Sequence, residues 1–211
     1  IYTLKDEIGR GGMAVVWLAD VDLDRFDFTT LYAYTQVQAR THAERRQKSE
    51  ELAKKLKGKK LDSATIRVVL ETQGIPIPAP QVALKIANAN ADVPRFEGEW
   101  KNLLCLHHET VGTVYGGGGQ KGTSYYAMER MEGIVPAARI KDEFTIRQKL
   151  EIVIQAGRGL QYLHDNGLVH RDVKPANILT CEIERGVFVT KVTDLGLAKN
   201  LEFGPEASPH D

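Results

Sequence analysis

A polar loop in the last quarter of the chain restricts what this sequence can fold into more than any other feature. It reads His-Arg-Asp-Val-Lys-Pro-Ala-Asn over residues 170–177, and a turn of sequence Asp-Leu-Gly begins at Asp194. Eight specified residue types in a fixed order are far less frequent by chance than a glycine pattern. The spacing predicts a site where charged groups converge, and it disfavours the alternative of an ordinary polar loop. The two segments supply a carboxylate, a cation, an amide and a second carboxylate, namely Asp172, Lys174, Asn177 and Asp194.

A glycine-rich stretch near the start is a weaker signal. Residues 8–16 read Ile-Gly-Arg-Gly-Gly-Met-Ala-Val-Val, which approximates G-x-G-x-x-G-x-V with Ala14 in place of the third glycine. Glycines allow a backbone to approach a phosphate closely because no side chain intervenes. The alternative, a dinucleotide-binding turn, requires the glycines to open a helix. Residues 15–17 are strand-like instead, so the stretch favours a β-hairpin.

A lysine in an apolar strand and a glutamate on an apolar helix face are expected to pair. Residues 82–85 read Val-Ala-Leu-Lys, and residues 94–106 predict an amphipathic helix with proline in its first turn. Glu99 shares the helix face of the apolar residues, where an unpaired carboxylate is costly to bury. We therefore expect an ion pair between Lys85 and Glu99, with Glu97 as the second choice.

Taken in order, these motifs resemble those of a bacterial-type serine/threonine protein kinase. The resemblance covers residues 1 to about 20 and 80 to about 199. It implies an α+β, two-lobed protein kinase-like fold. An antiparallel β-sheet lobe with one regulatory helix would span residues 1–127, with a helical insertion at about 20–80. The hinge and an incomplete, mostly helical carboxyl-terminal lobe would span residues 128–211.

The same resemblance assigns roles to individual residues and implies ATP and Mg²⁺ as cofactors. Asp172 would accept or orient the proton of the attacking hydroxyl, and Lys174 would steady the γ-phosphate. Lys85, paired with Glu99, would reach the α- and β-phosphates, while Asn177 and Asp194 would bind magnesium. The nucleotide-binding residues would be Ile8, Gly9, Gly11, Gly12, Ala14, Val16, Ala83, Lys85, Met128, Glu129, Met131 and Leu179, with Met128 as the gatekeeper.

The function that the resemblance implies is ATP-dependent phosphorylation of serine or threonine hydroxyls on protein substrates. Lys174 favours serine and threonine over tyrosine. The alternative is a catalytically inactive nucleotide-binding scaffold or interaction module, against which the retained Asp172, Asn177 and Asp194 argue. Only fifteen residues follow Gly196, so we expect a serine/threonine kinase truncated after the Asp-Leu-Gly turn, and for the isolated chain both the active and the inactive alternative stay open.

Composition restricts the partners and the compartment. Lysine plus arginine and aspartate plus glutamate number 28 each in the 211 residues, so no overall charge favours nucleic acid. Cys105 and Cys181 lie among apolar residues, as expected of unpaired thiols in a reducing compartment. No run approaches the roughly 20 apolar residues of a membrane span. We therefore expect no membrane segment in this chain and a cytoplasmic location.

An insertion separates the glycine-rich stretch from the lysine strand. Residues 17–84 are far more than two strands and a hairpin loop require, so roughly 50 residues are additional. Residues 36–57 predict a polar helix with several Glu-to-Lys pairs at i,i+4, and residues 63–72 predict a second, short helix. Protein docking on residues 20–80 is favoured over nucleic-acid binding by the lysines of 54–60, and a solvated helix without a partner is the remaining alternative.

Two further local predictions concern a helix and a turn. Thr145 and Gln148 form a capping-box pattern at the start of a helix over residues 145–165. Gly157 and Gly159 are expected to permit close packing of this helix. The four glycines of 116–119 predict the turn of a hairpin.

Overall fold

The chain divides into two compact units. The structure is a computed structural model that describes residues 2–25, 62–72, 77–104, 106–120, 122–135, 137–194 and 199–200. The first unit contains residues 1–107 and 113–130, and the second contains residues 108–112 and 131–211. The first unit ends at Arg130, close to the predicted boundary after residue 127.

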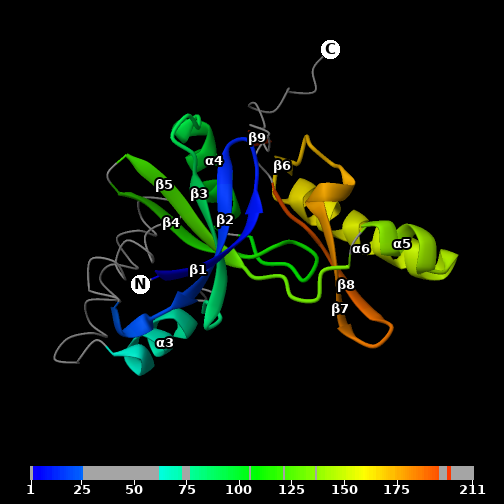
Figure 1. Cartoon of the computed structure of the whole chain (residues 1–211), viewed down its shortest axis with the longest axis horizontal. Coiled ribbons are helices and arrows are strands. Elements are labelled where there is room, and N and C mark those ends of the chain that lie inside the picture. The colour runs from blue at the N-terminus through cyan, green and yellow to red at the C-terminus, as the bar shows by residue number, and fades with distance from the viewer. Residues whose placement is uncertain are drawn as a thin grey trace, which may run out of the picture. The chain divides into compact units, whose positions relative to one another are not determined.

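A five-stranded antiparallel sheet forms the framework of the first unit (Figure 1). Its spatial order is β1-β2-β3-β5-β4, so β2 of the glycine-rich hairpin pairs with the lysine strand β3 despite the long insertion. The strands are β1 (Tyr2–Arg10), β2 (Ala14–Val21), β3 (Gln81–Ala87), β4 (Val114–Gln120) and β5 (Thr123–Glu129).

The sheet carries a different helix on each face. Helix α3 (Ser63–Thr72) shares a buried apolar cluster with Val82 and Leu84 of β3, whereas α4 (Val93–Leu103) contacts β4 and β5. Phe96 of α4 packs on Tyr126, the β5 residue opposite Lys85. Because successive side chains of a strand point to opposite faces, Lys85 and Tyr126 lie on the α4 face.

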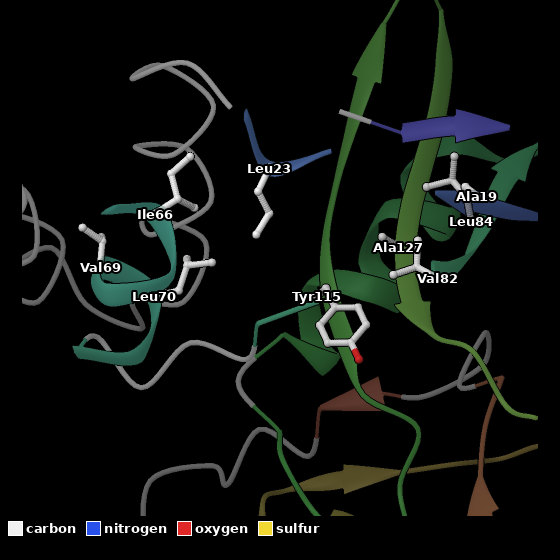
Figure 2. Close-up of a cluster of buried hydrophobic side chains, with 9 residues drawn as sticks. All are labelled: Ala19, Leu23, Ile66, Val69, Leu70, Val82, Leu84, Tyr115 and Ala127. Atoms are coloured by element: carbon white, nitrogen blue, oxygen red, sulfur yellow. The ribbon is translucent and has the colours of Figure 1, made fainter. Parts of the chain in front are cut away.

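Helix α3 is the part of the insertion that the structure describes, together with the short 3₁₀ turn Leu23–Arg25. Its bounds confirm the predicted helix at 63–72, whereas the predicted polar helix at 36–57 lies outside the described residues. Figure 2 shows its three buried side chains together with those of the sheet. Ile66, Val69 and Leu70 are each at most 2% exposed, so α3 belongs to the core of the first unit.

Helix α4 begins at a capped turn and packs closely on a glycine-rich strand. The Asp92 side chain accepts a hydrogen bond from the backbone of Arg95, which satisfies one of the free N–H groups of the first turn. β4 and β5 form the predicted hairpin, but the glycines 116–119 lie inside β4, so their predicted place in the turn is wrong. A Cβ on Gly117 would lie 2.8 Å from the Trp100 indole, because the ring packs directly against the strand backbone.

The second unit is built around one long helix and a hairpin. Helix α6 (Ile146–Asp165) has the predicted capping box, with Thr145 and Gln148 exchanging both hydrogen bonds. It packs on β8 and β6. The other elements are α5 (Ala137–Glu143), β6 (Leu168–Val169), the 3₁₀ turn η2 (Pro175–Asn177), β7 (Ile178–Glu184), β8 (Val187–Val192) and β9 (Lys199–Asn200), with β7 paired to β8 and β6 to β9.

A single glycine allows α6 to approach the strand that leads to the Asp-Leu-Gly turn. A Cβ on Gly159 would lie 2.6 Å from the Thr110 carbonyl oxygen and 3.0 Å from Val192. At Gly157 an added Cβ would meet nothing within 4 Å, so of the two glycines only Gly159 has the predicted packing role. None of the helices in the described ranges combines the length and the apolar character needed to cross a bilayer.

The core role of α3 leads to a stability prediction. Leu70→Ala should lower the free energy of unfolding by about 2–5 kcal/mol, because it removes a fully buried side chain and leaves a cavity. Val68 is 57% exposed on the same helix, so Val68→Ala should change stability by less than about 0.5 kcal/mol. Denaturant unfolding of both variants tests this, and equal effects would show that α3 does not pack on the sheet.

Candidate active site

Four of the predicted nucleotide-binding side chains share one face of the first sheet. Val16 lies opposite Lys85 in the β2–β3 register, and Ala83 lies opposite Met128 in the β3–β5 register. Residues directly opposite each other in an antiparallel pair share a face, as do residues two apart in one strand. The register therefore places the lysine beside three apolar side chains suited to a flat, aromatic base.

The glycine-rich hairpin is tied to the end of β3. Gly11 N–H donates to the Ala14 carbonyl at 2.9 Å and closes the turn. The Asn88 side chain donates to the carbonyls of Gly11 and Gly12 at 3.2 and 3.0 Å, a link that the sequence analysis missed because it joins residues far apart. An added Cβ on Gly12 would meet nothing within 4 Å, so the space beside this glycine is open to a ligand.

The remaining residues predicted along this hairpin lie on its two strands. Ile8 is 52% exposed near the end of β1, and Gly9 pairs with Val16 of β2. Ala14 is buried at the start of β2, opposite Ala87 of β3. The exposed Ile8 thus offers apolar surface next to the glycine turn.

Lys85 lies against an aromatic ring on the α4 face. Its Nζ is 5.5 Å from the centroid of the Tyr126 ring, which is 2% exposed. Glu99 occupies the helical position between Phe96 and Leu103, but its side chain is outside the described part of the chain. Pairing of Lys85 with Glu99 therefore stays a prediction.

The second-choice carboxylate, Glu97, has a different partner. Its Oε2 accepts a hydrogen bond from Lys101 Nζ at 2.6 Å, one helical turn further along α4. The Glu97 side chain is 32% exposed and that of Lys101 is 53% exposed. The pair is therefore a solvated i,i+4 ion pair of modest strength.

The end of β5 is fixed by the segment before β4. The Glu129 backbone N–H donates to the Thr113 carbonyl at 2.8 Å, and its Oε2 accepts from the Thr113 N–H at 3.3 Å. Arg130 donates to the side chain of Gln81 at the start of β3. Met131, the next predicted nucleotide contact, belongs to the second unit.

In the second unit, side chains of the polar loop 170–177 form one hydrogen-bonded group. Asp172 Oδ2 accepts from Lys174 Nζ at 2.7 Å and from Asn177 Nδ2 at 3.1 Å. The same Asn177 nitrogen donates to the Asp172 carbonyl at 2.9 Å. Since the amide nitrogen faces Asp172, the amide oxygen of the 4% exposed Asn177 is turned to another side.

These partners set the charge of Asp172. The hydrogen bond from Lys174 holds the pKa of the Asp172 carboxyl below its ordinary value, and the Lys174 charge and the Asn177 amide act in the same direction. A lowered pKa keeps this carboxylate ionised at neutral pH, and protonation occurs only in acid. The 33% exposed side chain can therefore accept a hydrogen bond from a substrate hydroxyl.

A buried histidine connects the loop to the strand end before Asp194. His170 is 1% exposed, and its Nδ1 accepts from the Asp172 backbone N–H at 3.3 Å. The ring proton is therefore on Nε2, which donates to the Thr193 carbonyl at 3.1 Å. The Thr193 N–H also donates to the Asn177 carbonyl at 2.9 Å. His170 belongs to the motif, but no local sequence signal indicates this linking role.

Two non-glycine residues of this region have a left-handed backbone. Arg171 has φ 63° and Asp194 has φ 56°. Such conformations cost of order 1–3 kcal/mol each and persist only where the surrounding structure imposes them. The bonds that His170 and Asn177 make with Thr193 supply that constraint on both segments.

Leu179 presents apolar surface in the second unit. It lies in β7 and lines a pocket of about 610 Å³ together with Ile140 of α5, Ile152 of α6 and the loop residues Pro175 and Ala176. The lining is mostly apolar and also includes Lys141, Lys149 and Thr180. The contact of Leu179 with a base stays a prediction.

The residues present are suited to magnesium bound jointly with a phosphate. In the described ranges, no group of three or more His, Cys, Asp or Glu side chains is arranged to hold a metal ion. Magnesium needs no such cluster, because it prefers oxygen ligands and commonly binds through one or two protein groups plus substrate phosphates and water. The amide oxygen of Asn177 and the carboxylate of Asp194 are oxygen donors of this kind.

The connecting role of His170 can be tested without a ligand. His170→Phe keeps a ring of similar size but leaves the Thr193 carbonyl without its donor, which should cost about 1–3 kcal/mol of stability. Hydrogen exchange at the Asp172 amide should also become faster. His164→Phe, at an exposed position of α6, is the control and should change neither quantity. Unchanged exchange at Asp172 in His170→Phe would contradict the proposed link.

Comparison with known proteins agrees with these features. A profile of the protein kinase domain matches residues 79–209, more than half of the chain. The serine/threonine-protein kinase PknA of Mycobacterium tuberculosis is 34% identical over 120 residues, which cover 54% of this chain and 27% of PknA. PknB of the same organism, also a serine/threonine-protein kinase, is 32% identical over 113 residues, which cover 51% of this chain and 17% of PknB.

The chain thus spans less than a third of the length of these two relatives. The predicted fold class, an α+β kinase-like fold with a sheet unit and a mostly helical unit, is confirmed by the domain match and the sheet topology. The resemblance drawn from the motifs is confirmed in the same way. The chain belongs to the protein kinase domain family.

Proposed function

We propose that this chain takes part in ATP-dependent phosphorylation of serine and threonine hydroxyls on protein substrates. The observation that carries the proposal is the hydrogen-bonded group of Asp172, Lys174 and Asn177, joined through His170 to the strand end before Asp194. The serine/threonine kinase names of the relatives support the substrate class. ATP as a substrate also agrees with the cytoplasmic location predicted from the sequence.

In this proposal, the Asp172 carboxylate receives the hydroxyl proton as the hydroxyl oxygen attacks the γ-phosphorus. The bond between the γ-phosphorus and the bridging oxygen breaks, and ADP leaves. Because the transition state of phosphoryl transfer is loose, Asp172 orients the hydroxyl more than it abstracts the proton early. A carboxylate with a lowered pKa is suited to that task, since it stays ionised and accepts a hydrogen bond.

Charge neutralisation is divided among the remaining groups. Lys174 steadies the γ-phosphate, and Lys85 contacts the α- and β-phosphates with Glu99 as its partner. Magnesium, when bound, neutralises charge on the phosphates, and Asn177 and Asp194 would hold it. Fixed charges of this kind supply most of the rate enhancement in phosphoryl transfer.

The base would contact the apolar face of the first sheet, where Val16, Ala83 and Met128 form the predicted surface. Leu179 is a further predicted apolar contact. The backbones of Glu129 and Met131 would bind the edge of the adenine. Glycines 9, 11 and 12 would approach the phosphates, and Ile8 and Ala14 would flank them.

Protein docking on the insertion is a separate part of the proposal. Most of the insertion, including the charged stretch that motivates the idea, lies outside the described residues. Its described helix, α3, uses its apolar face within the first unit. Docking is therefore assigned to the polar residues before α3, whose alternating charges suit a protein partner better than nucleic acid.

Substitution of the proposed base separates catalysis from binding. Asp172→Asn should lower turnover by at least about 10²-fold, a typical contribution of a positioned general base, while Mg·ATP affinity stays within about twofold. The assay is transfer of radiolabelled phosphate from ATP to a generic basic protein, with phosphoamino-acid analysis. Asp142→Asn, on the exposed side of α5, is the matched control and should keep full activity. Loss of ATP affinity in Asp172→Asn, or unaltered turnover, would contradict the assigned role.

The hydrogen bonds of Asn88 predict an effect on nucleotide binding. Asn88→Ala releases the carbonyls of Gly11 and Gly12 and should weaken Mg·ATP affinity about fivefold, the value of roughly one net hydrogen bond. Asn90→Ala changes an exposed asparagine two residues further along and should have no effect. Calorimetric titration measures the Mg·ATP affinity of both variants. Equal affinities would show that the Asn88 side chain does not order the glycine turn.

A further inference from the structure

The ring of Tyr126 lies between the phosphate-directed lysine and helix α4. Lys85 Nζ is 5.5 Å from the ring centroid, and the ring of Phe96 packs on the same tyrosine with centroids 5.3 Å apart. We propose that Tyr126 is a positioning residue that holds the Lys85 ammonium and couples it to the placement of α4. This inference rests on the proposed function, because the lysine position matters for activity only if a nucleotide binds there.

The strand register places Lys85 and Tyr126 side by side. Lys85 and Tyr126 are directly opposite in the β3–β5 pair, so their side chains leave the same face from neighbouring positions. Tyr126 is 2% exposed and Phe96 is fully buried, which leaves the tyrosine ring little freedom to turn away. The ring is therefore present at this position whether or not a ligand is bound.

The chemistry of the pair suits a lysine that must meet phosphates. The face of an aromatic ring attracts an ammonium group, and the attraction is stronger when water is partly excluded. A lysine side chain is long and flexible, so fixing its end before a ligand arrives removes part of the ordering cost of binding. The ring attracts the ammonium without adding a negative charge of its own, so it leaves the attraction of the phosphates undiminished.

Phe96 connects this pair to the helix that carries the predicted lysine partner. Phe96 and Tyr126 form a tilted aromatic pair with an interplanar angle of 46°, a geometry that contributes beyond simple burial. Phe96 stands three residues before Glu99 on α4. A shift of α4 must therefore move Phe96 against Tyr126, and through that ring it changes where the lysine ammonium rests.

The first test measures Mg·ATP affinity in three variants. Tyr126→Leu removes the ring and should weaken affinity about fivefold or more, in line with the strength of a partly buried cation–π contact. Tyr126→Phe retains the ring and should bind within about twofold of the original chain. Tyr125→Leu is the matched control, because Tyr125 directly precedes Tyr126 in β5 and packs with Tyr2 on the opposite, α3 face. That control should lower thermal stability without weakening affinity.

A double substitution distinguishes positioning from general damage. In a Lys85→Met background, Tyr126→Leu should cause no further loss of affinity, because the ring acts through the ammonium that is already absent. Additive losses would overturn the proposal. Equal affinity of the original chain and Tyr126→Leu would also overturn it.

A second measurement needs neither a nucleotide nor a folded leucine variant. In the ligand-free chain labelled with ¹³C-lysine, the ε-methylene protons of Lys85 should show an upfield ring-current shift that persists in Tyr126→Phe. Lys85→Arg assigns the signal. An unshifted Lys85 signal would overturn the contact itself. A shifted signal in a chain that fails to bind Mg·ATP would support the contact and contradict the proposed function, so the two failures are distinguishable.

Discussion

The hydrogen bonds of one buried imidazole hold the polar loop 170–177 in place. His170 accepts from the Asp172 backbone and donates to the carbonyl of Thr193, so the segments that carry the two acidic residues cannot move independently. Asn177 adds a second connection to Thr193 through its backbone carbonyl. The left-handed backbones at Arg171 and Asp194 are sustained by this arrangement. A site that works by fixed charge depends on such positioning more than on any single side chain.

The first unit presents Lys85 on one face of a sheet that carries a helix on each face. Helix α4 packs beside the lysine on one face, and α3 of the insertion covers the other. The strand pairing is unaffected by the insertion, since β2 and β3 remain neighbours although residues 22–80 separate them. The same pairing puts Val16 opposite Lys85. Val16 lies outside the stretch that the family profile matches, whereas Lys85 lies within it.

Sequence reasoning succeeded where a signal is local. The capping box of Thr145 and Gln148, and the short apolar pattern of 63–72, each predict a helix that the structure has at those residues. It failed at 116–119, where a run of glycines was taken for a turn although it forms a strand against Trp100. That packing joins residues far apart in the chain, so no local pattern predicts it. The contacts of Asn88, His170 and Tyr126 also join distant residues, and they are visible only in the structure.

The proposed function depends on Asn177 and Asp194 holding magnesium when ATP is bound. Paramagnetic broadening by Mn²⁺ in the presence of ATP tests it most directly, since broadening reports which backbone amides lie near the metal. The amides of Asn177 and Asp194 are expected to broaden first, before those elsewhere in the second unit. Absence of broadening, or broadening centred on residues far from these two, would contradict the proposed function.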